Sequence, residues 1–137
     1  MNINLEDRFE QKFIVSDEIY QGFILLFKDK NPLHTDGAFA MNKGFKSCVM
    51  HGNILNGFLS FFIGECLPQK NVIIHSEEIS YKNAVYLYDE LIFTAHVTGV
   101  FESVSAIEFK FNFANSDSKT VAKGKIQINV WSVFRIL

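Results

Sequence analysis

The sequence predicts an α+β fold in which a curved antiparallel β-sheet wraps around a central buried α-helix. Two patterns support this prediction. Apolar residues recur at helical spacing between Ser16 and Cys66, whereas from Asn71 onwards they tend to alternate with polar residues. The strand-like runs of the second half follow one another without an intervening helix, as they do in antiparallel sheets. We therefore expect a single domain over residues 1–137.

The first predicted elements are a strand from Arg8 to Val15 and a helix after it. Ser16 is a favourable helix N-cap, and the apolar residues that follow recur every three or four positions as far as Phe27. Since the residue before a proline disfavours helical backbone, the Asn31-Pro32 step should end this helix near Lys28. A strand and an amphipathic helix therefore precede the most unusual stretch of the chain.

This stretch, from Asp29 to His34, combines an acid and an imidazole with a proline between them. Neighbours on a helix would be three or four residues apart, so the longer spacing predicts a non-helical bend. Such a bend could aim both side chains at one point, where a carboxylate and a histidine can perform general acid–base chemistry. After the bend, Thr35 or Asp36 can cap a short helix that Gly44 ends.

The central helix is predicted from Gly52 to Cys66, and Pro68 closes it. Its apolar residues cover nearly the whole circumference, and a helix that is apolar all round is buried. Asn56, Ser60 and Glu65 interrupt the apolar stretch, which is also shorter than the ~20 residues of a membrane span. The helix is therefore expected in a protein core and not in a membrane.

Four strands are expected after the central helix. Alternation is clearest in residues 107–113 and 123–130, and turn-forming residues separate the runs. The four runs are Val72–Ile74, Leu91–Val100, Val104–Phe113 and Val121–Val133. The edges of such a sheet remain open, and a second copy of the chain could close one of them, which predicts a homodimer or a higher homo-oligomer.

Composition narrows the class of protein. The chain is 48% hydrophobic and 20% charged, which suits a packed core, and its formal charge of -2 gives no electrostatic case for nucleic-acid binding. Cys48 and Cys66 lack metal-ligand spacing and lie in apolar contexts, as buried free thiols do. Residues 1–12 contain no apolar run of the signal-peptide type. We expect a soluble cytoplasmic protein with no nucleic-acid or membrane partner.

The segment that begins at Asp29 resembles a known family, the MaoC-like dehydratases, which include the (R)-specific enoyl-CoA hydratases. The matching residues are Asp29-Lys30-Asn31-Pro32-Leu33-His34, Ala38, Ala40, Val49-Met50-His51-Gly52, Leu67-Pro68, Ser80-Tyr81-Lys82 and Tyr88-Asp89-Glu90-Leu91. They extend over most of the chain. The resemblance implies the hot-dog fold, a homodimer with active sites at or near the subunit interface, and a role in fatty acid metabolism.

The resemblance also implies roles for individual residues. Asp29 and His34 match the catalytic pair of the family, and Gly52 matches the glycine whose backbone N–H holds the thioester carbonyl. Asn31 matches the asparagine of the motif. Ser60 matches a helix serine that hydrogen-bonds near the catalytic carboxylate. These five residues, together with His51 as a supporting residue, are the candidate site.

His51 and Lys28 need separate comment. His51 precedes the central helix, and we expect it to orient the loop and not to perform chemistry. Lys28 stands where the family usually has glycine, so it adds a charge near the pair and costs backbone freedom. A metal site formed by His34, Asp36 and His51 matches no strong metal motif, so we expect no metal.

The implied activity is that of a hydro-lyase, which adds water to a trans-2-enoyl thioester to give the (R)-3-hydroxyacyl thioester, or catalyses the reverse dehydration. Asp29 and His34 would move protons on one face of the substrate, and Gly52 would stabilise the enolate oxygen at a helix N-terminus. The substrate is expected to be an acyl-CoA or another acyl thioester, with no cofactor beyond coenzyme A as part of that substrate.

Two alternatives stay open. An acyl-CoA thioesterase of the same fold also needs a carboxylate and a helix N-terminus, but has no reason for the Asp-x-Asn-Pro-Leu-His bend. A non-catalytic subunit that binds acyl thioesters need not keep an acid–base pair. Turnover of an enoyl thioester would separate the hydratase from both.

Overall fold

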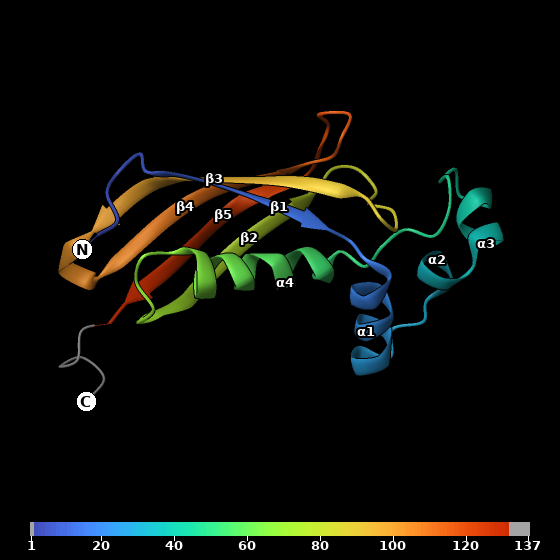
Figure 1. Cartoon of the computed structure of the whole chain (residues 1–137), viewed down its shortest axis with the longest axis horizontal. Coiled ribbons are helices and arrows are strands. Elements are labelled where there is room, and N and C mark those ends of the chain that lie inside the picture. Colours follow the sequence, from blue (N-terminus) through green and yellow to red (C-terminus); the bar gives the residue numbers. More distant parts are fainter. Residues whose placement is uncertain (1, 132–137) are drawn as a thin grey trace.

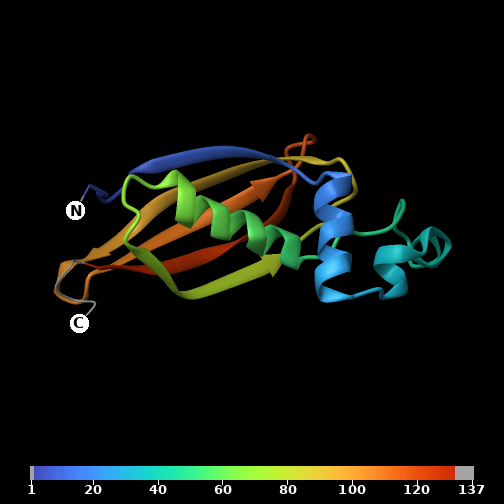
Figure 2. The same cartoon turned by 60° about the horizontal axis from the view of Figure 1, so that its bottom comes forward.

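The computed structural model describes residues 2–131. Five strands form one antiparallel sheet in the order β1-β3-β4-β5-β2, and helix α4 lies along one face of it (Figure 1). Helices α1, α2 and α3 lie beyond one end of the sheet (Figures 1 and 2). The expected α+β architecture is therefore confirmed. Within the described residues, no helix is long and apolar enough to span a membrane.

Strand β1 (Arg8–Ile14) and helix α1 (Asp17–Phe27) form where the sequence predicts them. The hydroxyl of Ser16 accepts a hydrogen bond of 3.2 Å from the N–H of Ile19, which is the expected N-cap. Lys28 ends the helix in the left-handed conformation, with φ of 61°. A side chain is costly in this conformation, which explains why glycine suits this position.

The stretch after α1 differs from the expected bend. Helix α2 (Pro32–Thr35) is a single turn that contains His34, so the segment is non-helical only as far as Asn31. The side chain of Asn31 caps the turn by accepting a hydrogen bond of 3.0 Å from the N–H of Leu33. Pro32 takes the first helical position, where its missing N–H is not needed and its fixed φ suits the helix. Proline starts this helix and does not break it.

Helix α3 (Gly37–Asn42) follows at once and confirms the short helix expected after the bend. Its N-cap is Asp36, whose Oδ1 accepts hydrogen bonds from the N–H groups of Ala38 and Phe39. Together α2, α3 and the loop after them form a small unit beside α1. The chain then returns to the sheet and enters α4.

Helix α4 (Asn53–Phe61) continues into a π-helical turn (Phe62–Cys66), which together match the predicted central helix. The side of α4 that faces the sheet is buried. The opposite side is open, because Ser60 is exposed and the side chain of Phe61 is 48% exposed. The expectation that the helix is buried all round is therefore wrong for the single chain, since one sheet covers only one face of a helix.

The remaining strands are β2 (Val72–Tyr81), β3 (Glu90–Phe101), β4 (Ala106–Ala114) and β5 (Thr120–Val130). The expected strands lie within or close to these bounds, except that β2 is much longer than the run Val72–Ile74. The expected end of the last strand at Val133 lies outside the described residues. Strands β1 and β2 form the two edges of the sheet.

An aromatic core joins α4 to the sheet. Phe13 stacks on Phe58 with ring centroids 4.4 Å apart, and Phe62 packs on Phe93 at 4.8 Å. Phe62 and Phe93 are fully buried, so each contributes a large apolar area to the interface between helix and sheet. This packing fixes the position of α4, and therefore of its N-terminus, which lies beside α1 and α2.

Candidate active site

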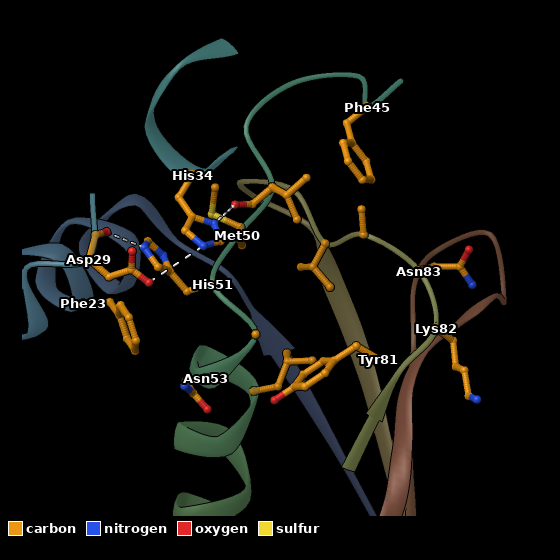
Figure 3. Close-up of a pocket in the computed structure, with 15 residues that line it drawn as sticks. Phe23, Asp29, His34, Phe45, Met50, His51, Asn53, Tyr81, Lys82 and Asn83 are labelled. Carbon is orange, nitrogen blue, oxygen red and sulfur yellow. Dashed lines mark hydrogen bonds and ion pairs between the residues drawn. The ribbon is translucent and has the colours of Figure 1, made fainter. Parts of the chain in front are cut away.

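Asp29 and His34 lie together next to the N-terminus of α4 (Figure 3). The distance between Asp29 Oδ2 and His34 Nε2 is 3.9 Å, and the two side chains are 49% and 17% exposed. This separation is longer than a direct hydrogen bond. A small molecule placed between the two atoms could therefore contact both.

The imidazole of His34 has a fixed orientation. Its Nδ1 lies 2.7 Å from the carbonyl oxygen of Val49, and because a carbonyl only accepts, Nδ1 must donate. In the neutral ring, Nε2 then carries the lone pair and faces Asp29. The hydroxyl of Tyr20 donates to the backbone carbonyl of His34 and anchors the same turn. His34 is therefore arranged to exchange a proton at Nε2.

His51 supports both members of the pair. Its ring is 3% exposed, stacks on His34 with centroids 3.9 Å apart, and also packs on Phe23 at 4.6 Å. Its Nε2 donates a hydrogen bond of 2.9 Å to the backbone carbonyl of Asp29. The buried Nδ1 has no hydrogen-bond partner among the described residues. This geometry agrees with the expectation that His51 orients the loop.

Gly52 is the N-cap of α4, where the helix dipole places partial positive charge. Within residues 2–131 its backbone N–H donates to no protein acceptor, so it is available to a ligand. A Cβ at this position would lie 2.9 Å from Cε1 of Tyr81. Only glycine fits here without displacing the aromatic ring.

Tyr81 is a site residue to which the sequence analysis gave no role. It ends β2 and lies over Gly52, and its hydroxyl is 3.3 Å from Nδ2 of Asn56 on α4. Burial raises the pKa of the Tyr81 phenol, so it keeps its proton at neutral pH. Only the alternation of β2 could have indicated that this side chain faces α4, and the predicted strand stopped seven residues earlier.

Asn31 contacts the catalytic carboxylate, whereas Ser60 makes no such contact among the described residues. The backbone N–H of Asn31 donates to Asp29 Oδ1 at 3.2 Å, so the motif asparagine helps to place the carboxylate. Ser60 lies on the exposed face of α4, eight positions after Gly52. That spacing is about 12 Å along a helix. In the described part of the chain Ser60 makes no hydrogen bond to Asp29, so the expected contact is not found within one subunit.

The pair faces a cavity of about 580 Å³. Asp29, His34, His51, Gly52 and Tyr81 all contribute to its lining, and Lys82, Asn83 and Phe45 line it as well (Figure 3). This volume is within the usual range of small-molecule sites. The acid–base pair, the free amide and the aromatic ring therefore line one open cavity.

The ligand atoms of Asp29, His34 and His51 all lie within 4.8 Å of one another. Two histidines and one carboxylate have the donor chemistry of a transition-metal site. The set with Asp36 in place of Asp29, which the sequence did not favour, does not form, because the Asp36 carboxylate caps α3. One nitrogen of each ring already faces a backbone carbonyl, which leaves one nitrogen of each free.

The family assignment follows from comparison with known proteins. Residues 4–114 match the family model described as MaoC like domain, and the chain belongs to this family. Among its relatives is an (R)-specific enoyl-CoA hydratase from Aeromonas caviae, 36% identical over 80 residues, which are 58% of this chain and 60% of the relative. The chain thus aligns with about three fifths of the length of this relative.

Two further matches cover more of the chain. The (R)-specific enoyl-CoA hydratase of Rhodospirillum rubrum is 29% identical over 119 residues, which are 87% of this chain and 81% of the relative. The solved structure of an (R)-hydratase from Aeromonas caviae superposes with a TM-score of 0.86 and 23% identity, covering 95% of this chain and 98% of that one. This likeness, together with the sheet and its packed helix, confirms the hot-dog fold.

Proposed function

We propose that this chain is a hydro-lyase that interconverts trans-2-enoyl and (R)-3-hydroxyacyl thioesters, with coenzyme A as the acyl carrier. One observation carries the proposal: Asp29 Oδ2 and His34 Nε2 lie 3.9 Å apart in a cavity that also contains the free N–H of Gly52. Water addition to an enoyl thioester needs a base that activates water, an acid that protonates the α-carbon and a donor that stabilises the enolate oxygen. The names of the two hydratase relatives support the same reaction.

The arrangement accounts for each step of hydration. The thioester carbonyl accepts a hydrogen bond from the Gly52 N–H, which stabilises the enolate oxygen as it gains charge. Water between Asp29 and His34 loses a proton to one of them as its oxygen bonds to the β-carbon. A proton from the pair then bonds to the α-carbon. Because both groups lie on one side of the substrate, H and OH add to the same face.

We further propose that the active form is a homodimer and that it needs no metal or redox cofactor. Large apolar side chains remain open on three elements: Leu25 on α1 is 71% exposed, Phe61 on α4 is 48% exposed and Ile73 on β2 is 45% exposed. Strand β2 also has an unpaired edge, which is an aggregation risk unless a partner covers it. A second copy would cover these surfaces. The cytoplasmic location expected from the sequence stays a prediction.

The test is hydration of crotonyl-CoA, followed as the loss of enoyl thioester absorbance, with chiral analysis of the product. We expect (R)-3-hydroxybutanoyl-CoA. Release of free coenzyme A would instead identify a thioesterase. Binding of crotonyl-CoA without turnover would identify a non-catalytic subunit.

Substitution of the pair tests the mechanism. Asp29→Asn and His34→Ala should each lower kcat by at least about 10²-fold, because each removes a proton-transfer group. Circular dichroism should show an unchanged fold, since both side chains are partly exposed. Turnover close to that of the wild type by either variant would remove that residue from the mechanism.

A further inference from the structure

A second cavity, of about 820 Å³, opens between α1 and α4, and we call it the α1–α4 groove. It shares Phe23, Asp29 and Asn53 with the catalytic cavity, so the two spaces meet at the catalytic carboxylate. Figure 2 shows α1 crossing the N-terminal end of α4, which places the groove beside the acid–base pair. The groove therefore adjoins the site already described.

The groove is mostly apolar, although Asn53 and Asn56 also line it. Among the described residues that line it, Asp29 is the single charged one, and it lies where the groove meets the catalytic cavity. Leu26 and Phe27 on α1 contribute apolar surface that is 72% and 69% exposed in the single chain. Ile54 and Phe58 on α4 are among the residues across from them. Such a surface suits a hydrocarbon ligand and not a charged one.

Two glycines widen the groove, Gly22 on α1 and Gly57 on α4. A Cβ built on either residue would meet no other heavy atom within 4 Å. Close helix packing therefore does not explain these glycines, and glycine within a helix is less stable than alanine. Their effect on the structure is to leave open space where larger side chains would fill the groove.

We propose that the α1–α4 groove binds the acyl chain of the thioester, and that Gly22 and Gly57 set the length and bulk of chain that the enzyme accepts. The inference rests on the proposed function, because it takes the thioester carbonyl to bind at Gly52 and the β-carbon to lie at Asp29. The acyl carbons beyond the β-carbon then enter the groove at Asp29. The catalytic cavity, with Lys82 and Asn83 in its lining, holds the polar carrier end.

The length of the groove indicates the substrate class. Its lining on α1 runs from Ile19 to Phe27, and eight helical residues span about 12 Å. A four-carbon acyl group would leave most of this space empty. The preferred substrates are therefore medium-chain enoyl thioesters, and the short crotonyl group is a poorer substrate.

The experiment compares kcat/KM for trans-2-octenoyl-CoA and crotonyl-CoA in the wild type and in Gly57→Leu and Gly22→Leu. Leucine is a better helix former than glycine, so the helices should form. We expect the octenoyl-to-crotonyl ratio to fall at least roughly tenfold in both variants, as when an apolar pocket is filled. Gly64→Leu is the matched control, because Gly64 also has open space around it but does not line the groove. Its ratio should equal that of the wild type.

Binding of the saturated octanoyl-CoA and butanoyl-CoA, measured by calorimetry, separates this inference from the proposed function. Tighter octanoyl-CoA binding that Gly57→Leu abolishes supports the groove even in a chain without turnover. Hydration of crotonyl-CoA with an unchanged octenoyl-to-crotonyl ratio in both variants contradicts the proposed role of the groove. The same result agrees with the proposed hydratase function. An unchanged ratio together with a loss of the dimer in size-exclusion chromatography assigns the groove to a second copy and also overturns the proposal.

Discussion

The ring of His51 and the backbone of Asp29 are joined by a hydrogen bond of 2.9 Å between Nε2 and the carbonyl oxygen, although 22 residues separate them in the sequence. The same ring stacks on His34 with centroids 3.9 Å apart. His51 therefore contacts both members of the catalytic pair. Because its ring is buried, it cannot move without displacing the loop that carries them.

Substitution of His51 should therefore affect turnover more than binding. His51→Phe keeps a ring on His34 but loses the hydrogen bond to Asp29, so kcat should fall by about 10- to 100-fold as the carboxylate shifts. KM for crotonyl-CoA should change much less. His51→Gln, whose side-chain amide can still donate to the Asp29 carbonyl, is the matched control and should retain more activity. Equal losses in both variants would mean that the hydrogen bond does not position the pair.

Gly52 offers a second test, because its position is limited by Tyr81. A Cβ at residue 52 would lie 2.9 Å from the Tyr81 ring, so Gly52→Ala must displace either the ring or the amide. We expect kcat to fall by roughly 10²-fold, the order of effect of losing one oxyanion donor. Steady-state kinetics on crotonyl-CoA would measure the change.

The double variant Gly52→Ala/Tyr81→Ala is the control for this steric explanation. Removing the ring makes room for the added methyl group, so part of the lost kcat should return. Tyr81→Ala alone shows what the ring contributes by itself. A double variant no better than Gly52→Ala would show that contact with Tyr81 is not the cause.

The helix boundaries that the sequence predicted best are those with local signals. Ser16 and Asp36 cap helices through hydrogen bonds to amides two or three residues ahead, so a short window contains the whole cause. Pro32 shows the limit of this approach. The Asn31-Pro32 step correctly predicts the end of α1 near Lys28, but proline is also favourable at the first position of α2, so the expected bend contains a helical turn.

Features that depend on distant parts of the chain were harder to predict. Asp29, His34 and Gly52 could be named because they lie in one motif. Tyr81 reaches the site only because β2 pairs with β5 in a register that places it opposite Ala122. A local sequence pattern does not determine the register between strands that are distant in the chain. The open face of α4 has a similar cause, since periodicity marks apolar positions but not which of them the sheet covers.

Lys28 carries a stability cost that can be measured. Its φ of 61° and ψ of 21° are left-handed, which costs a residue with a Cβ about 1–2 kcal/mol. Glycine avoids this cost but loses about 0.5–1 kcal/mol through the greater freedom of the unfolded chain. Lys28→Gly should therefore raise the free energy of unfolding by about 0.5–1 kcal/mol, measured by urea denaturation.

Lys28→Ala is the control for the effect of charge and side-chain length. Alanine also removes the lysine side chain, but its Cβ keeps the left-handed strain. We expect its unfolding midpoint to match or fall below that of the wild type. An equal gain in both variants would mean that the lysine side chain, and not the backbone conformation, is responsible.

The close approach of β2 and β5 at Gly124 predicts a large loss of stability when this residue is substituted. A Cβ on Gly124 would lie 1.9 Å from the backbone carbonyl oxygen of Glu78, a group that cannot rotate away. Gly124→Ala must therefore push the strands apart, and we expect a loss of about 3 kcal/mol or more in the free energy of unfolding. Gly64→Ala, with no atom within 4 Å of its added Cβ, should be neutral or slightly stabilising.

Because β2 also carries Tyr81, the Gly124 variant should lose activity at temperatures where it is still folded. A Gly124→Ala protein with the urea midpoint of the wild type would contradict the strand spacing on which the position of Tyr81 depends.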